Sequence, residues 1–360
     1  MNVKDIPVID NHSHLFDVSD KNREMINILS LSLNEIPEKQ LKNSLIYHKY
    51  ISELKDLLDF EGGYDDVLTK RKGLLETDYK GYVKRLCQDV NMHTFIIDLG
   101  YKPASVSLED FENILPCDVK YMYRIESIVD ELWEDKVSFK KAEERFYDEI
   151  EKAKSTLDVV AIKSIIGYRT GLNIEKKERS LMKKENYTEK EFRDFFFISA
   201  LEKAGQLNIP MQVHASFGES NIDLLKNNPL KLKSIIDDPK YSKTDIVLVH
   251  GGYPYSFEAG YLAAMYPNIY LDMSEMVPFV PLGMKKGLRD MIDMCPFNKL
   301  MFGSDGFVLP DIHWLAARMA KKEMLNIVKE LIEEDYFNEK YGQEILEMVF
   351  WKNAKKVYNI

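Results

Sequence analysis

The sequence predicts an α/β fold, a (β/α)8 TIM barrel that forms one domain over residues 1–360, with a helical insertion after the first strand. Eight apolar segments of strand length alternate with segments of helical character, and this alternation is typical of a parallel sheet flanked by helices. Eight such units close into a barrel. An open, doubly wound sheet is the alternative, but no glycine-rich fingerprint for nucleotide binding follows the first strand.

The predicted strands are short apolar runs, most of which end in a polar residue or a glycine. In chain order they span residues 7–10, 93–100, 119–126, 159–167, 209–216, 245–252, 268–275 and 300–306. Short apolar runs of this kind are expected for strands that are buried on both faces. Each run is therefore expected to form part of the barrel wall, with its polar end at the carboxyl-terminal face.

The predicted helices show apolar residues at intervals of three and four, as at Leu41, Leu45, Leu54 and Leu58. They cover residues 38–60, 79–91, 129–155, 192–207, 222–237, 257–266, 287–294, 311–334 and 339–358. No strand is predicted within residues 15–92. We interpret that stretch as the helical insertion, and we expect it to cover one end of the barrel.

The composition is that of an ordinary globular protein, with 45% hydrophobic and 30% charged residues and a net charge of −10. This charge leaves no broad basic face for nucleic acid or for an anionic membrane, so the expected partner is a small-molecule substrate. Cys87, Cys117 and Cys295 are far apart in the sequence, which fits a reducing compartment rather than a disulfide framework.

The sequence also indicates where the protein is located. No apolar run approaches the roughly 20 residues of a membrane span, and the few residues before the first strand leave no room for a signal peptide. We therefore expect a cytoplasmic enzyme. A homo-oligomer is compatible with the sequence, which offers no recognisable interface.

His12 and His14 lie two residues apart at the end of the first predicted strand. Side chains repeat every two residues in a strand, so both imidazoles are expected on the same side. Two converging imidazoles supply half of a transition-metal site. Taken alone, the pattern is equally compatible with a pair of histidines at a strand end or on the surface.

Further candidate ligands close three other predicted strands. His214 ends the fifth strand, His250 the sixth and Asp305 the eighth. A barrel brings its carboxyl-terminal strand ends around one opening, so these residues are expected to converge with the first histidine pair. Four imidazoles and a carboxylate suit zinc, manganese, iron or nickel. The remaining three of the seven histidines are expected to have ordinary structural roles; they are His48, His93 and His313.

Lys163 lies within the apolar run of the fourth predicted strand. A buried lysine is unfavourable unless its charge is removed or paired. Three interpretations stay open: a salt bridge to Glu126, a side chain that extends outward to solvent, or a carbamate formed with CO2 that bridges two metal ions.

Together, these residues resemble the amidohydrolase superfamily of metal-dependent barrel hydrolases. The likeness rests on His-x-His, Lys163, His214, His250 and Asp305 in that order, and it spans residues 7–306. The segments Lys-Ser-Ile-Ile-Gly-Tyr-Arg-Thr-Gly and His-Gly-Gly-Tyr-Pro-Tyr are similar to a FluG-type branch.

The resemblance implies a ligand set. His12, His14 and Asp305 would hold one metal, His214 and His250 a second, and carboxylated Lys163 would bridge the two. Zinc is the first expectation for one or two ions, with manganese, iron and nickel open. Some relatives keep a single metal, and in those the lysine is not a ligand.

We expect chemistry in which a metal lowers the pKa of bound water, with Asp305 and His250 as the catalytic residues beside it. The predicted reaction is hydrolysis of a C–N amide-type bond in a small polar substrate, for example a γ-glutamyl or other amino-acid conjugate. The alternatives are a mononuclear decarboxylase or deaminase, and a catalytically inactive binding protein on the same barrel.

Four residues near strand ends are candidates for substrate binding. Arg169 is suited to a bidentate contact with a carboxylate, and hydroxyl groups are available on Tyr168, Tyr253 and Tyr255. For each of these residues an ion pair or simple packing is the competing interpretation. Arg124 and Glu126 are expected to pair with each other, and Ser274 and Glu275 are candidates to support the ligands from behind.

Overall fold

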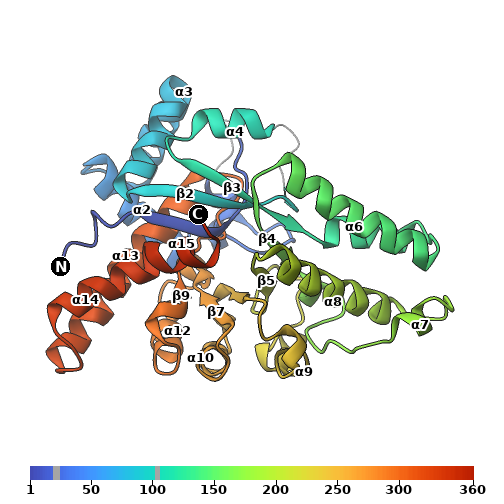
Figure 1. The fold of residues 1–360 in the computed structure, drawn as a ribbon. Coiled ribbons are helices and arrows are strands. Elements are labelled where there is room, and N and C mark those ends of the chain that lie inside the picture. The colour runs from blue at the N-terminus through green and yellow to red at the C-terminus, as the bar shows by residue number, and fades with distance from the viewer. Residues whose placement is uncertain (19–24, 102–105) are drawn as a thin grey trace.

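The computed structural model describes residues 1–18, 25–101 and 106–360, and within them the chain folds as a parallel barrel (Figure 1). Eight strands form one sheet in the order β1-β2-β3-β4-β5-β6-β7-β9, and every neighbouring pair is parallel. The strands of the described residues are β1 (Val8–Ser13), β2 (Met92–Asp98), β3 (Asp118–Arg124), β4 (Val159–Ser164), β5 (Met211–His214), β6 (Ile246–Val249), β7 (Ile269–Asp272), the two-residue β8 (Ser274–Glu275) and β9 (Leu300–Met301).

Backbone hydrogen bonds bring the last strand back to the first. The Asn11 amide donates to the Phe302 carbonyl at 3.0 Å, and the His14 amide donates to the Gly306 carbonyl at 2.8 Å. In the other direction, the Ser304 amide donates to the His12 carbonyl at 3.2 Å. The predicted barrel is therefore confirmed, and its seam joins His12 and His14 to the segment that carries Asp305.

Helices surround the strands, as the alternating pattern predicts (Figure 1). The longer ones are α2 (Leu45–Leu58), α3 (Tyr64–Asp89), α4 (Leu108–Ile114), α5 (Glu126–Glu134), α6 (Phe139–Thr156), α8 (Glu189–Leu207), α10 (Ser256–Met265), α12 (Gly283–Ile292), α13 (Pro310–Glu333) and α14 (Glu339–Glu347). Shorter helical turns are α1 (Glu38–Leu41), α7 (Arg179–Met182), α9 (Lys233–Ile236), α11 (Met276–Phe279) and α15 (Asn353–Val357), which follows a π-helical turn over Met348–Lys352.

Several predicted helices are divided in the structure, among them the predicted helix 38–60, which consists of α1 and α2. The predicted helix 129–155 is two helices, α5 and α6, separated by Lys136 in a left-handed conformation with φ 50°. The predicted helix 222–237 consists of 3-10 turns over Leu224–Lys226 and Pro229–Leu232, followed by α9. Asp223 and Asn228 accept backbone hydrogen bonds that start new turns, because short polar side chains compete with helical pairing. The apolar spacing alone does not reveal these interruptions.

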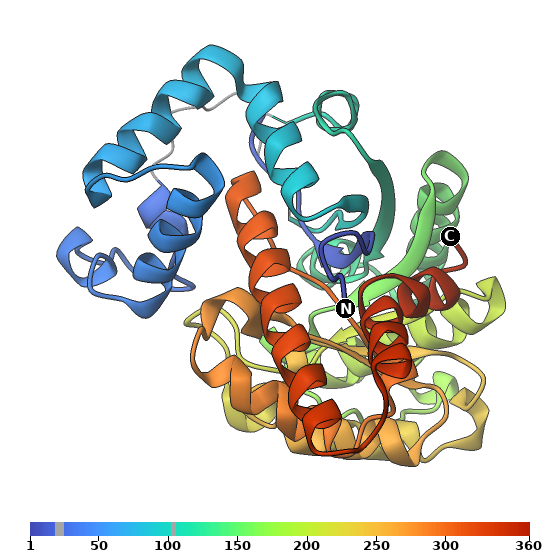
Figure 2. The same ribbon diagram turned by 90° about the vertical axis from the view of Figure 1, so that its left-hand side faces the viewer.

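Residues between β1 and β2 are largely helical, as expected for the 15–92 stretch, although residues 19–24 lie outside the described part of the chain. Their helices α2 and α3 lie to one side of the barrel, with α3 alongside α13 (Figure 2). One point of attachment is a buried ion pair in which Arg71 donates to Asp311 at 2.8 Å and 2.7 Å. Whether this stretch is an insertion within a single domain stays a prediction.

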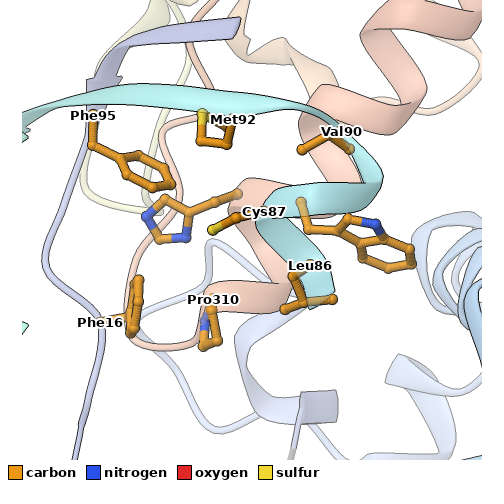
Figure 3. A pocket seen from close by; sticks show the side chains of 9 residues that line it. Phe16, Leu86, Cys87, Val90, Met92, Phe95 and Pro310 are labelled. Carbon is orange, nitrogen blue, oxygen red and sulfur yellow. The ribbon is translucent and has the colours of Figure 1, made fainter. Parts of the chain in front are cut away.

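The junction between α3, β2 and α13 is apolar (Figure 3). It encloses a cavity of about 10 Å³, which is no larger than a single water. Its lining comprises Phe16, Leu86, Cys87, Val90, Met92, Phe95, Pro310, His313 and Trp314. This dense packing fixes the helices beside the first two strands.

No helix in the described parts of the chain is both long and apolar enough to cross a membrane.

Candidate metal centre

His12 in β1 and His14, which directly follows this strand, converge on one carboxylate. Asp305 Oδ1 lies 3.0 Å from His12 Nε2 and 3.2 Å from His14 Nε2. His12 is 1% exposed and His14 is 8% exposed. The barrel seam explains this convergence, since it places residues of the first strand beside residues that are almost 300 positions later in the sequence.

Lys163 lies at the same point. Its Nζ is 3.2 Å from His12 Nε2, and the residue is 1% exposed. Burial lowers the pKa of this amine to about 8, so more of it is neutral near pH 7 than in water. The salt bridge to Glu126 is not formed: Glu126 begins α5 and accepts a hydrogen bond from Ser164 Oγ at 2.7 Å.

His214 and His250 form the other side of the centre, with ring centroids 4.4 Å apart. His214 Nε2 lies 2.8 Å from the Phe217 carbonyl. A carbonyl only accepts, so we assign the proton to Nε2, which leaves the Nδ1 lone pair available to a metal.

On His250 the other ring nitrogen, Nε2, is the one available to a metal. Its Nδ1 lies 2.9 Å from Ser274 Oγ, and the Ser274 hydroxyl donates to Asp272 at 2.8 Å. Because the serine proton is directed at Asp272, we assign the His250 proton to Nδ1 and the free lone pair to Nε2. This chain of hydrogen bonds is the kind of support that orients a metal-binding histidine.

The electrostatic environment favours neutral imidazoles and an ionised carboxylate. Burial, together with the nearby Lys163 amine, lowers the pKa of His12 to about 4. Burial also holds the pKa values of His214 and His250 well below the usual range. Burial alone would raise the pKa of Asp305, but the surrounding histidines lower it well below its usual value. Neutral imidazole and carboxylate are the forms that bind metals.

These donors fit a divalent cation. Three groups of side chains each bring one ligand atom per residue within 4.8 Å of the others. The groups are His12, His250 and Asp305; His12, His14 and Asp98; and His214, His250 and Glu275. Mixed nitrogen and oxygen donors suit zinc and neighbouring transition metals. The structure therefore has groups of residues that could hold a metal ion, and which metal they hold stays a prediction.

Three residues around the centre have left-handed backbone conformations that are unusual for residues other than glycine. These are His250 with φ 73°, Glu275 with φ 57° and Asp305 with φ 53°. All three follow strands at the same end of the barrel, and such strain is concentrated at functional sites. The turns direct the side chains to positions that a continuing strand would not reach.

A cavity of about 310 Å³ opens above these residues. It is lined by His12, His14, Leu33, Tyr101, Arg124, Lys163, Ile165, Tyr168, Arg169, His214, Glu219, Asn221, His250 and Asp305. The volume suits a small molecule. The lining of this cavity therefore includes the predicted metal ligands. It also includes two of the predicted substrate-binding residues, Tyr168 and Arg169.

Two arginines in the cavity wall are each held by a carboxylate. Arg124 Nε and Nη2 donate to Asp98 at 2.9 Å and 2.6 Å, so the expected pairing of Arg124 with Glu126 is wrong. Arg169 donates to Asp130 at 2.7 Å through Nη2 and at 3.2 Å through Nε. In both guanidinium groups, Nη1 makes no hydrogen bond to a described residue and is available to a ligand.

The three candidate tyrosines differ in their position relative to the cavity. Tyr168 lines the cavity and hydrogen-bonds Glu219. Tyr253 packs against Phe217 with ring centroids 5.4 Å apart, and the Tyr255 hydroxyl donates to the Leu224 carbonyl at 3.2 Å. Neither tyrosine is among the described residues that line the cavity.

Some residues of this site are not evident from the sequence. Asp98 ends β2, whose histidine, His93, stands at the opposite end of the strand, and Glu219 lies in a loop, whereas Glu275 is anticipated only as a support for the ligands. Arg124 can be recognised from the sequence as a charged residue at a strand end. Its neighbour Glu126 suggests a local ion pair, but the structure pairs Arg124 with Asp98 instead. Only the barrel geometry identifies Asp98 on the adjacent strand as that partner.

The fold is an α/β barrel with candidate metal-binding side chains at the carboxyl-terminal strand ends. The model of the Amidohydrolase family matches residues 142–360, which is more than half of the chain. The protein belongs to this family. Its predicted membership is confirmed.

A curated relative and solved structures agree with this assignment. Protein fluG of Emericella nidulans is 26% identical over 98% of this chain, and the chain spans only 46% of that relative's length. A candidate metal-dependent hydrolase from Lactobacillus casei has a TM-score of 0.86 and 23% identity, with 99% of this chain and 96% of that chain covered. A uronate isomerase from Thermotoga maritima has a TM-score of 0.69 and 15% identity, with 99% and 95% covered. These structures establish the shared fold.

Proposed function

We propose that the protein is a metal-dependent hydrolase that cleaves a C–N amide-type bond in a small, anionic substrate. One observation carries this proposal: four imidazoles, a carboxylate and a buried lysine converge at the base of a cavity of about 310 Å³. We propose a γ-glutamyl or related amino-acid conjugate as the substrate, which is what the resemblance of the sequence to a FluG-type branch implies.

The residues divide into two ligand sets. His12, His14 and Asp305 would hold one ion, and His214 with His250 would hold a second. Lys163, once carboxylated by CO2, would bridge them, which is supported by its position 3.2 Å from His12 and by its burial. Bound there, zinc would lower the pKa of a coordinated water and polarise the scissile carbonyl.

Asp305 is suited to proton transfer, because its carboxylate is ionised and lies beside the histidine pair. In the proposed reaction it accepts the proton of the attacking water and later donates it to the departing amine. The His250 imidazole, fixed by Ser274, would lie beside the same reacting centre and help to hold its charge in place.

Arg124 and Arg169 are suited to substrate recognition. Both line the cavity, and each is fixed by a carboxylate while Nη1 remains available. A guanidinium that is already oriented binds a substrate carboxylate with less loss of side-chain freedom. We therefore propose that the substrate carries at least one carboxylate, with Tyr168 as a further polar contact at the cavity wall.

The first test measures the metal content of the full chain by elemental analysis and maps the ions by anomalous scattering. We expect two zinc ions per chain and turnover of γ-glutamyl amides or related anionic amides. Absence of metal binding after reconstitution would contradict the proposal. A single ion, an unmodified Lys163 and release of CO2 from an aromatic acid would instead support a mononuclear decarboxylase.

Lys163→Ala tests the proposed bridge. The variant should bind one ion fewer and lose about 10²-fold or more in kcat, because the bridging oxygen is missing. Short carboxylic acids should restore part of the activity by taking the place of the carbamate. Wild-type metal content in this variant would show that Lys163 is not a ligand.

A further inference from the structure

Glu275 is a buried carboxylate beside the candidate metal centre, and one of its oxygens lacks a partner. The side chain is 2% exposed. Its Oε2 accepts no hydrogen bond from residues 1–18, 25–101 or 106–360. Buried polar atoms are almost always paired, because an unpaired one loses its hydration without compensation. An unpaired carboxylate oxygen leaves this position open to a ligand, and its neighbours decide which ligand fits.

The neighbours of Glu275 are metal-binding side chains. One ligand atom from each of Glu275, His214 and His250 lies within 4.8 Å of the other two. Glu275 Oε2 is 3.7 Å from His250 Nδ1, which is longer than a hydrogen bond. That nitrogen is already engaged by Ser274 at 2.9 Å, so Glu275 is not needed to orient the imidazole.

The backbone holds Glu275 in this place at a cost. Its φ of 57° is left-handed, as are those of the proposed ligands His250 and Asp305. Glycine adopts such a conformation more readily than glutamate does. The shared strain groups Glu275 with the ligands of the centre, because all three turns direct a side chain into the same region.

We propose that Glu275 is a metal ligand, and that it completes the position formed by His214 and His250. Two imidazoles and a carboxylate suit a divalent transition-metal ion such as zinc or manganese. This inference rests on the metal centre of the proposed function and not on its reaction. It gives the second position an anionic ligand of its own, so that this position holds an ion even when Lys163 is an unmodified amine.

Glu275→Gln tests the proposal, and Glu126→Gln is a matched control. Glu126 is also buried at this end of the barrel and also has an Oε2 without a described partner. It accepts a hydrogen bond from Ser164 at 2.7 Å and belongs to none of the three ligand groups found among the described residues. Both variants exchange a buried carboxylate for an amide of the same shape.

The measurement is zinc binding by the chelator-stripped full chain, by calorimetric titration and by elemental analysis after gel filtration. We expect Glu275→Gln to lose the second zinc, or to bind it at least ten-fold more weakly. Glu126→Gln should match the wild type. Zinc binding by Glu275→Gln within two-fold of the wild type, or an equal loss in both variants, would overturn the proposal.

A second measurement does not depend on the folding of the variant. In an anomalous-scattering map of the zinc-loaded wild type, a Glu275 oxygen should lie about 2.0–2.2 Å from the ion near His214 and His250. A separation beyond about 3 Å, or no ion at that position, would overturn the inference. Zinc bound in this way without amide turnover would uphold the inference and reject the proposed reaction.

Discussion

Two buried charged clusters in this protein differ in how completely their polar atoms are paired. At the contact between the α2–α3 segment and α13, Asp311 accepts two hydrogen bonds from Arg71 and one each from Tyr50 and Tyr82. At the candidate metal centre, the described residues provide no hydrogen-bond partner for His12 Nδ1, His14 Nδ1 or Glu275 Oε2. Complete pairing indicates a structural role, whereas several buried polar atoms without partners around one cluster are compatible with a site for a ligand.

The largest expected effect is the loss of enzymatic activity when residues of the candidate metal centre, the cluster with unpaired atoms, are replaced. Asp305→Asn and His214→Ala should each lower kcat/KM by about 10³-fold or more, because each removes a metal ligand and the first also removes a proton acceptor. The metal-free forms should stay within about 1 kcal/mol of the wild type in unfolding free energy. Steady-state kinetics and urea denaturation measure the two quantities, and retention of full activity in either variant would reject the site.

The paired cluster should respond in the opposite way. Asp311→Asn leaves the buried Arg71 guanidinium without its counter-ion, and this should destabilise the fold by about 3–5 kcal/mol. Urea denaturation of the metal-free chain measures the loss, and zinc stoichiometry of the folded variant should be unchanged. If Asp311→Asn lost zinc while keeping its stability, the division into a structural and a ligand-binding cluster would be wrong.

A smaller effect is expected for the two arginines of the cavity wall. Each guanidinium is paired with a carboxylate, while its Nη1 remains available to a ligand. Arg124→Lys and Arg169→Lys should each raise KM about ten-fold for an anionic amide and less than two-fold for a neutral one. Arg145→Lys is the control, since Arg145 pairs with Glu131 and does not line the cavity. Equal changes in KM for both substrates would remove the proposed carboxylate contact.

The smallest expected effect is the pH dependence of the paired cluster. Burial would raise the pKa of Asp311, but Arg71 and the two tyrosines lower it below its usual value. The folded pKa is therefore below the unfolded value of about 3.9, and the stabilisation by the carboxylate is complete above pH 4 and lost as the pH falls.

This loss of stabilisation at low pH can be measured by comparing urea denaturation of the wild type and Asp311→Asn at pH 7, 5 and 3. The difference in stability should be constant between pH 7 and 5 and should shrink at pH 3, by at most about 1.4 kcal/mol per pH unit. A difference that grows on acidification would contradict the lowered pKa.

The sequence predicts the barrel and much of the candidate centre, because both depend on repeated local patterns. Apolar strands recur along the chain, and His12, His14, His214 and His250 stand at or just after strand ends. A closed barrel then brings them together, as the distances to Asp305 show. The roles of these residues in metal binding and catalysis stay predictions.

What the sequence does not predict depends on neighbours across strands and on single backbone angles. Arg124 has a carboxylate two positions away, yet it pairs with Asp98 on the adjacent strand. Glu275 reaches the histidines through a left-handed turn that no residue pattern announces. The divided helix at 222–237 depends on side-chain capping by Asp223 and Asn228, which apolar spacing does not report.

The seam between β1 and the segment after β9 has a consequence for how the protein matures. His12 and Asp305 are joined there by a backbone hydrogen bond of 2.8 Å, although nearly the whole chain separates them. Such distant contacts form late in folding, since the closure entropy of a long loop must be overcome first. An ion bound by these two residues would therefore be loaded only after the barrel has closed, and once bound it would resist reopening at the seam.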